Sequence, residues 1–255
     1  MRFACLGSGS RGNALIVEAG RTRLMLDCGY PVREAERRLA RLGLDPAELA
    51  GILVTHEHSD HTAGVCKFAR KHDLPLWLTH GTLQGMPGDV AALQRINIID
   101  SHSAFAVGEL QMLPFPVPHD AREPAHFVFS DGAHRLGVLT DTGTATSHIQ
   151  EMLSGCDALV LECNHDIDLL MNGDYPQMLK SRVAGRYGHL DNQAAAGLLA
   201  ALDRSRLQHL IAAHLSQQNN TPELACGALA EVMGCDPGWI GVADQDRGFD
   251  WREIA

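Results

Sequence analysis

The sequence predicts an α/β protein in which two sheets pack face to face with helices outside them, an αββα sandwich. Short apolar segments with strand character alternate with amphipathic helical segments along the chain. The second half of the chain repeats the strand and helix pattern of the first half. Because 255 residues suffice for one large hydrophobic core and nothing marks a boundary, we expect a single domain over residues 1–255.

The N-terminal part alternates apolar stretches with turn residues, a pattern that predicts a strand meander. Its strands are expected at residues 3–6, 14–18 and 22–27. Apolar residues at helical spacing amid charges then predict a surface helix over 31–43, which ends at Gly43. The apolar run at 51–55 predicts the strand that follows this helix.

The same alternation continues from residue 62 to the C-terminus. Helices are expected at 62–72, 81–93, 144–154, 175–187, 191–203 and 222–233, and Pro87-Gly88 is expected to break the second of them. Strands are expected at 74–79, 96–99, 109–117, 126–130, 135–140, 158–162, 209–213 and 239–243.

Composition and charge restrict the classes of function. A net charge of -10 argues against a broad nucleic-acid surface, because phosphate binding depends on clustered Lys and Arg, although it allows a local one. No apolar run approaches the roughly 18 residues of a membrane span, and the N-terminus lacks a signal-peptide core, so we expect a cytoplasmic protein without membrane association. Seven cysteines without a Cys-x-x-Cys pair fit reduced thiols better than disulfides.

Residues 56–61 read His-Glu-His-Ser-Asp-His, directly after an apolar strand. Such residues are poor material for a packed core, because each would need a buried polar partner, but they are good metal ligands. In an extended segment His56 and His58 point to the same side, whereas Asp60 and His61 reach a neighbouring position where the next helix begins. The segment can therefore supply ligands to two adjacent metal ions.

Three further candidate ligands stand where predicted strands end. They are His119, Asp141 and His214, each at the carboxyl end of an apolar strand. Open α/β folds gather their binding residues at this edge of a sheet. Any one of them could instead terminate a strand or cap a helix, but the joint pattern favours all three as further ligands.

This order of residues resembles that of the metallo-β-lactamase-fold hydrolases, in which His-x-His-x-Asp-His is followed by His, Asp and His. The resemblance spans nearly the whole chain and implies the fold of that family. It also implies how two ions are held: His56, His58 and His119 on one, Asp60, His61 and His214 on the other, with Asp141 bridging both.

Asp27 matches a family position that supports the metal site, where a carboxylate orients a ligating imidazole; a turn carboxylate is the alternative. Imidazole and carboxylate ligands suit two divalent ions, Zn²⁺ or Mn²⁺, and also Fe²⁺. Two ions about 3.5–4 Å apart would turn a bridging water into the attacking hydroxide, so no protein nucleophile is needed. The ions would also stabilise charge on a phosphoryl or carbonyl oxygen. Asp60 is therefore expected to be catalytic as well as a ligand.

Two features distinguish members of this fold. His58 stands where flavin-linked di-iron reductases have Glu, which favours hydrolysis. The segment 188–195 resembles the Gly-His-Ser-Thr segment of tRNase Z, which supplies a histidine that protonates the leaving oxygen. His189 is then a candidate general acid, a role that suits a histidine because its ordinary pKa is about 6.5. The alternative is a helix-capping loop with Asp191 as N-cap and His189 incidental.

The whole chain resembles the small bacterial YycJ (WalJ)-like group, through the segments 7–13, 162–166, 188–190 and 214–220. Proteins of this group are regarded as 5′→3′ DNA exonucleases, so the resemblance implies a phosphodiesterase with DNA as substrate. Asp191 departs from the Ser that is more frequent in the group. Candidate substrate contacts lie in these loops and in a local basic patch: Ser10, Asn13, His165, Arg182, Ser216 and Asn219.

Too few residues separate Asp141 from His214 for the large insert of RNase J-like nucleases, and no Gly/Pro-rich arm of the tRNase Z kind is evident. Both observations disfavour processive ribonuclease and tRNA-end activity. Two rivals remain: a cytoplasmic thioester or lactone hydrolase that uses the same ions, and a ligand-binding member with low turnover. The filled ligand positions disfavour the second rival. The sequence leaves the physiological substrate, the cleavage polarity and the oligomeric state open, a homo-oligomer included.

Overall fold

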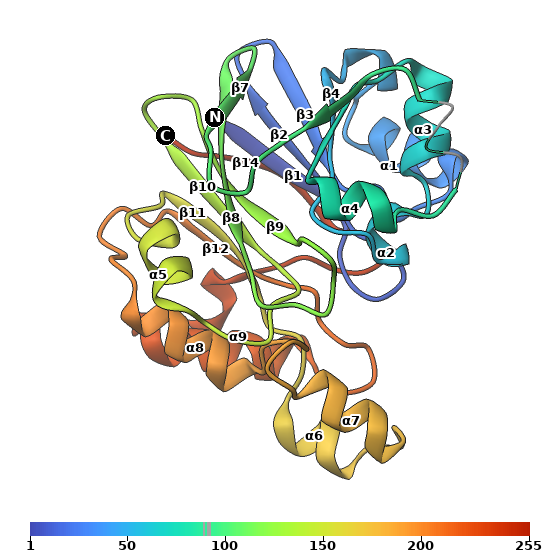
Figure 1. Cartoon of the computed structure of the whole chain (residues 1–255). Helices are drawn as coiled ribbons and strands as arrows, with labels where there is room; N and C mark the ends of the chain where they lie inside the picture. The colour runs from blue at the N-terminus through green and yellow to red at the C-terminus, as the bar shows by residue number, and fades with distance from the viewer. Residues whose placement is uncertain (89, 91–92) are drawn as a thin grey trace.

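The computed structural model in Figure 1 places two sheets face to face with helices outside them, and it describes residues 1–88, 90 and 93–255. The first sheet has the order β14-β1-β2-β3-β4-β5-β6. Its strands are β1 (Arg2–Gly7), β2 (Ala14–Ala19), β3 (Thr22–Leu26), β4 (Gly51–Leu53), β5 (Leu76–Leu78), β6 (Ile96–Ile98) and β14 (Phe249–Glu253). The αββα sandwich predicted from the sequence is confirmed.

The second sheet has the order β7-β8-β9-β10-β11-β12-β13. Its strands are β7 (Phe105–Val107), β8 (Leu110–Pro116), β9 (Ala125–Ser130), β10 (Arg135–Leu139), β11 (Ala158–Glu162), β12 (His209–Ala213) and β13 (Gly241–Val242). In both sheets the first three neighbouring pairs are antiparallel and the last three are parallel. The carboxyl ends of the parallel strands therefore meet at one edge of each sheet.

The central strands are apolar on both faces because both of their faces are buried. On β3, Leu24 and Leu26 pack between the two sheets, whereas Met25 packs under the helices of the first sheet. On β10, Val138 packs between the sheets and Leu139 faces the helices of the second sheet. This alternation is the period-two pattern of a strand, and it produces one apolar layer between the sheets and one under each helical layer.

The helices fall into two layers and a projecting pair (Figure 1). The first layer contains α1 (Val32–Arg41), α2 (Ser59–Thr62), α3 (Val65–His72) and α4 (His80–Gly85), and the second contains α5 (Ser147–Leu153), α8 (Asn192–Ala201) and α9 (Pro222–Met233). The pair α6 (Ile167–Asn172) and α7 (Gln177–Val183) projects from the body, and α7 has no buried residue.

Most of the predicted elements are present, with three informative differences. The helix predicted over 62–72 begins earlier and is divided at Gly64, where a Cβ would lie 1.9 Å from the Tyr30 carbonyl oxygen. The helix predicted over 81–93 ends at Gly85, before Pro87; residues 89, 91 and 92 lie outside the described residues. The sequence did not predict β7, α6 and β14, which are short and half-exposed. No helix within the described ranges has the length and apolarity needed to cross a membrane.

Candidate metal centre

Three strands of the two sheets end in residues with an unusual backbone. Asp27 follows β3 with φ 60°, Asp141 follows β10 with φ 51°, and His214 follows β12 with φ 56°. A non-glycine residue in this left-handed region costs on the order of 1 kcal/mol and persists where the surrounding structure holds it, often at functional sites. The three turns aim polar side chains at the space between the carboxyl ends of both sheets.

The first predicted ligand group, His56, His58 and His119, comes together from the two sheets. One ligand nitrogen from each lies within 4.8 Å of the others. The Nε2 of His58 lies 3.2 Å from the Asp120 carbonyl oxygen, and the Nδ1 of His119 lies 3.1 Å from that of Gly188. Each of these nitrogens donates its proton, because a carbonyl oxygen can only accept.

The remaining ring nitrogens of these two histidines then carry lone pairs that face each other. The His58 Nδ1 and the His119 Nε2 lie 3.2 Å apart. Ligand atoms about 2.0–2.1 Å from a tetrahedral zinc ion lie roughly 3.3 Å from one another, so this spacing fits a shared cation. Two opposed lone pairs repel each other without a cation between them.

A hydrogen bond to Thr55 likewise determines which ring nitrogen of His56 carries the proton. The Thr55 hydroxyl donates to Asp27 Oδ2 at 2.8 Å, so its oxygen accepts from His56 Nδ1 at 3.0 Å. The lone pair of His56 Nε2 is then free, and this atom is buried without a hydrogen-bond partner among the described residues. The residues present therefore fit a metal ion at this position.

The second predicted group contains Asp60, His61, Asp141 and His214, whose ligand atoms also lie within 4.8 Å of one another. His61 Nε2 lies 3.1 Å from Asp141 Oδ2, and His214 Nε2 lies 3.4 Å from Asp60 Oδ2 and 3.5 Å from Asp141 Oδ1. The Asp141 Oδ2 atom is buried and makes no well-aligned hydrogen bond in the described part of the chain. Two carboxylates and two imidazoles are suitable ligands for a second divalent ion.

Asp27 orients the second group without belonging to it. Its Oδ2 accepts from His61 Nδ1 at 2.8 Å, and its Oδ1 accepts from the Thr55 backbone N–H at 2.8 Å. This contact fixes the tautomer of His61 and directs its Nε2 toward Asp141. Asn13 contributes from the other side, because its Nδ2 lies 3.2 Å from Asp60 Oδ2 and 3.1 Å from His61 Nε2.

The charges in this cluster shift the pKa values of its members strongly. Burial lowers the pKa of His56 well below its usual range, and neighbouring histidines add to the effect. Burial also opposes protonation of His61, but the carboxylates of Asp141 and Asp60 outweigh it and raise the pKa of His61 well above its usual value. Burial opposes ionisation of Asp141, yet His214 and His61 hold its pKa well below the usual range. The cluster therefore presents ionised carboxylates to a cation.

A third group shares Asp141 and His214 with the second ligand group and includes a residue that sequence reasoning missed. Glu162 is fully buried at the end of β11, and its Oε1 accepts from His189 Nδ1 at 2.7 Å. Its Oε2 accepts from the backbone N–H groups of Thr142 and Leu190. Glu162 ends an apolar strand as Asp141 does, and this available signal could have identified it.

Glu162 determines the state of the His189 ring. Burial lowers the pKa of His189, but the Glu162 and Asp141 carboxylates raise it to about 9. Because Nδ1 donates to Glu162, the Nε2 atom of His189 is the one available to a substrate. The ring stacks on that of His214, with centroids 5.3 Å apart, so His189 lies directly beside the second ligand group.

The predicted substrate contacts lie in different surroundings. Ser10 is exposed, and Arg182 is exposed but its Nε pairs with Asp120 Oδ2 at 2.6 Å. His165, Ser216 and Asn219 are buried, and Ser216 Oγ accepts from the Asn219 backbone N–H at 3.1 Å. The substrate-binding role of these residues, and that of Asn13, stays a prediction.

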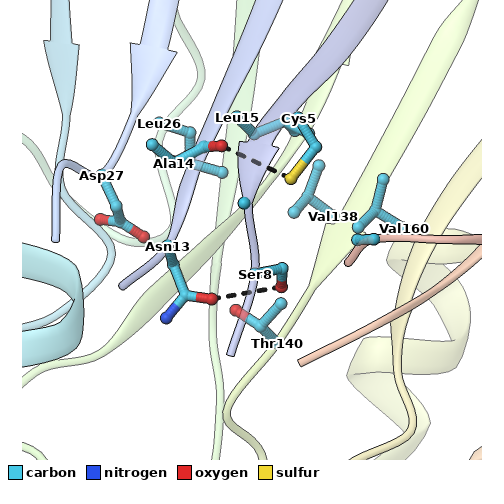
Figure 2. A pocket seen from close by; sticks show the side chains of 12 residues that line it. Cys5, Ser8, Asn13, Ala14, Leu15, Leu26, Asp27, Val138, Thr140 and Val160 are labelled. Atoms are coloured by element: carbon cyan, nitrogen blue, oxygen red, sulfur yellow. Dashed lines mark hydrogen bonds between the residues drawn. The ribbon is translucent and has the colours of Figure 1, made fainter. Parts of the chain in front are cut away.

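A small cavity lies between the two sheets, next to Asp27. Figure 2 shows Asn13, Ser8 and Thr140 at its polar end and Cys5 and Val138 at its apolar end. Its volume of about 30 Å³ is enough for a water molecule and far too small for a substrate. A substrate must therefore approach from the outer side of the ligand groups.

Comparison with known proteins identifies the family. A model of the β-lactamase superfamily domain matches residues 22–214. The exodeoxyribonuclease YycJ of Bacillus anthracis is 34% identical over 91% of this chain and 89% of that protein. The exodeoxyribonuclease WalJ of Streptococcus pneumoniae is 32% identical over 88% of this chain and 85% of that protein.

The fold also matches a solved structure, that of the metallo-β-lactamase fold protein YhfI from Bacillus subtilis. The TM-score is 0.75 at 16% identity, and the match covers 99% of each chain. The two His/Asp groups described above are typical of a binuclear metal site. The chain belongs to the β-lactamase superfamily, as a metallo-β-lactamase-fold protein of the group that includes YycJ and WalJ.

Proposed function

We propose that this protein is a two-metal phosphodiesterase that acts as a DNA exonuclease. The observation that carries the proposal is the convergence of free imidazole lone pairs and ionised carboxylates in two adjoining groups, with the His189–Glu162 pair beside them. The relatives YycJ and WalJ, which match 91% and 88% of this chain, bear the name exodeoxyribonuclease, and this supports DNA as the substrate.

His56, His58 and His119 would hold one ion, and Asp60, His61, Asp141 and His214 the other. Two divalent ions, Zn²⁺ or Mn²⁺ with Fe²⁺ also compatible, would supply an activated water and stabilise the charge that develops on the phosphate. The residues around the ligands keep this arrangement in place. Asp27 and Thr55 fix the ring orientations, so the ligand atoms need little rearrangement when a substrate binds.

His189 provides the group that protonates the leaving oxygen. In DNA hydrolysis the leaving group is a sugar alkoxide, which is a strong base and departs slowly unless it receives a proton. Glu162 and Asp141 raise the pKa of His189 to about 9, which favours the protonated ring near neutral pH. Divalent ions at the ligand groups would lower this pKa toward the range best suited to a general acid. The proton moves from His189 Nε2 to the oxygen, and Glu162 stabilises the ring in both states.

A substrate panel tests the proposed function. Purified protein loaded with Mn²⁺ or with Zn²⁺ is expected to release nucleotides from end-labelled linear DNA and to hydrolyse bis-p-nitrophenyl phosphate. Asp141→Ala removes a carboxylate shared by two groups of the site and is expected to abolish nearly all of both activities, while far-UV circular dichroism stays native. Metal analysis of the same samples reports how many ions each preparation holds.

The panel also distinguishes the proposal from its rivals. If metal-loaded protein leaves DNA and bis-p-nitrophenyl phosphate intact but cleaves a thioester or a lactone, the phosphodiesterase assignment is wrong. If it turns over none of these substrates at full metal occupancy, a ligand-binding member is the better description. Product analysis with DNA labelled at either end gives the cleavage polarity.

A further inference from the structure

We propose that a cavity beside His189 binds the base of the nucleotide whose phosphodiester bond is cleaved. This inference rests on the proposed nuclease function and identifies a part of the substrate that the metal centre itself does not contact. The cavity has a volume of about 500 Å³, within the range of small-molecule sites. Pro116, Pro118, Thr144, Arg186 and Tyr187 contribute to its wall.

The three chain segments that form the cavity are the same segments that carry the site residues. Pro118 immediately precedes His119, Tyr187 stands two residues before His189, and Thr144 follows Asp141 by three residues. Consecutive residues span at most about 3.6 Å each, so the cavity wall lies within one nucleotide's reach of the ligand groups. The base of a nucleotide whose phosphate lies at the metal centre can therefore reach this cavity.

Hydrogen bonds between these segments make the cavity a preformed part of the fold. Gly143 donates its backbone N–H to the Pro118 carbonyl at 2.9 Å, and Asp120 donates to the Tyr187 carbonyl at 3.0 Å. The Thr144 hydroxyl donates to the Arg186 carbonyl at 2.9 Å. The wall therefore needs little ordering when a ligand enters, which favours affinity.

The side chains at the cavity have the chemistry that recognises a base. Tyr187 is 60% exposed although it is aromatic. Its hydroxyl and the Arg186 guanidinium have no hydrogen-bond or ion-pair partner among the residues that the structure describes. Aromatic rings and guanidinium planes stack on bases regardless of their identity, and an arginine can also contact a phosphate.

The charge distribution supports a nucleotide as the occupant. The chain as a whole carries a net charge of -10, yet the segment that reaches the cavity contains Lys180, Arg182 and Arg186. The guanidinium of Arg182 is already paired with Asp120, so Arg186 is the cation at the cavity that is free to meet a phosphate. The two proline rings add rigid apolar walls against which a flat base can pack.

The test compares oligonucleotides that carry a base or an abasic residue at the terminal nucleotide, at the 5′ end in one set and the 3′ end in another. For wild type, the base is expected to lower KM on the order of tenfold at the end from which digestion proceeds, as one stacking contact predicts. Tyr187→Ala is expected to reduce this base-to-abasic ratio to about one. Tyr187→Phe keeps the ring and is expected to restore the ratio.

Trp239→Ala is the matched control, because Trp239 is also an exposed aromatic residue, at 44%, but does not line this cavity. Its ratio is expected to equal that of wild type. If Tyr187→Ala retains the wild-type preference for the base while folding normally, the base does not occupy this cavity and the inference is wrong.

A binding measurement separates failure of this inference from failure of the proposed function. The fluorescence of 2-aminopurine deoxyribonucleoside monophosphate is titrated with metal-loaded protein, without any cleavage step. Quenching that Tyr187→Ala weakens about tenfold and Tyr187→Phe preserves supports the cavity even if DNA is not hydrolysed. DNA hydrolysis without any Tyr187-dependent quenching overturns the inference and leaves the nuclease function in place.

Discussion

The contact between Asp27 and His61 shows how one carboxylate can act on a metal site from outside the ligand set. Asp27 Oδ2 fixes the proton on His61 Nδ1, so Nε2 presents its lone pair to the position between Asp60 and Asp141. A neutral amide of the same shape would offer only one oxygen to the three donors that now share the carboxylate.

Asp27→Asn is therefore expected to weaken binding of the ion at the second group by roughly 10–100-fold. Competition with a fluorescent chelator measures this affinity, and circular dichroism reports whether the fold is kept. Asp250→Asn makes the same chemical change at an exposed carboxylate far from the ligand groups in sequence, and it should leave the affinity unchanged. An unchanged affinity in Asp27→Asn would show that the contact does not control the metal.

The His189–Glu162 pair predicts a dependence on the leaving group. His189→Ala removes the proton donor, so hydrolysis of an ester with a sugar alkoxide leaving group should slow by about 10²–10⁴-fold. Hydrolysis of bis-p-nitrophenyl phosphate should slow far less, because p-nitrophenolate departs without a proton. Steady-state rates with both substrates measure the effect, and equal slowing of both would remove His189 from the general-acid step.

Glu162→Gln tests the residue that holds His189 rather than the proton donor itself. It removes the negative charge that raises the pKa of His189. The alkaline limb of the pH profile, where activity falls as His189 loses its proton, should therefore move to lower pH, while the dependence of the rate on the leaving group keeps the same direction. The pH dependence of kcat/KM with DNA measures this shift. A profile identical to that of wild type would mean that Glu162 is merely structural.

At the level of residues, the sequence predicted the candidate ligands and the neighbouring Asp27 but not Glu162. Ligands such as His56 and His58 lie in one short polar motif after an apolar strand, and this contrast is visible in the sequence. Glu162 comes to His189 only through the pairing of β11 with β10 and β12. Its place at the end of an apolar strand marks Glu162 as a candidate in the sequence, but its contact with His189 depends on the order of strands in the sheet and has no signal there.

The segment between α7 and α8 illustrates how one short element combines two functions. Asp191 caps α8, because its side chain accepts from the Ala194 backbone N–H at 2.7 Å, and this part of the sequence-based alternative is present in the structure. The same segment also places His189 in hydrogen-bond contact with Glu162. The cap and the proposed catalytic position are therefore two properties of one turn rather than competing explanations.

Asp191→Ala is expected to lower the free energy of unfolding by about 1 kcal/mol, because α8 loses its N-cap. Asp191→Ser is expected to stay near the wild-type value, since a serine oxygen can accept from the same N–H. Denaturant unfolding followed by circular dichroism measures both. Equal stability of the Ala and Ser variants would show that the cap contributes nothing to folding.

Whether an element was predicted depended on how deeply it is buried. Strands such as β3 and β11 are covered on both sides and appear in the sequence as apolar runs. The edge strand β14 has no fully buried residue and alternates polar with apolar side chains, so tertiary pairing with β1 determines its conformation. The short helix α6 has only one buried residue and too few turns for a helical period to stand out.

In the whole molecule, each ligand group draws on both sheets. His56 and Asp60 follow β4 in the first sheet, whereas His119, Asp141 and His214 follow strands of the second. An ion bound by either group would therefore connect the two layers of the sandwich. Metal binding and overall folding should be coupled through this arrangement.

Removal of metal is expected to lower the melting temperature of the entire protein. An ion present at one hundred times its dissociation constant adds about 2.7 kcal/mol, which corresponds to roughly 5–10 °C for a chain of this size. Differential scanning calorimetry before and after chelation, and after reloading with Mn²⁺ or Zn²⁺, measures the change. Asp141→Ala should show a smaller shift, because only the group of His56, His58 and His119 keeps all its ligands, and an equally large shift in that variant would contradict the assigned ligand set.

The sequence predicted the layered architecture because strand and helix signals alternate along the whole chain. It predicted α7 as the helix at 175–187 but not α6 or the projection of the two helices from the body. It also did not predict the cavity beside His189, which forms where segments distant in sequence meet. The sequence lacks a Gly/Pro-rich protruding arm. The α6–α7 pair that projects in Figure 1 is of a different kind, because it consists of two helices.

The two sheets have the same order of antiparallel and parallel strand pairs, which is the order expected if one half of the chain arose by duplication of the other. Asp27 follows β3 and Asp141 follows β10, the fourth strand of each sheet, and both have a left-handed backbone. Duplication of an ancestral half would leave this correspondence, with a carboxylate at the same corner of both copies. The two copies would then have diverged in task, one carboxylate facing the ions and its counterpart holding an imidazole in place.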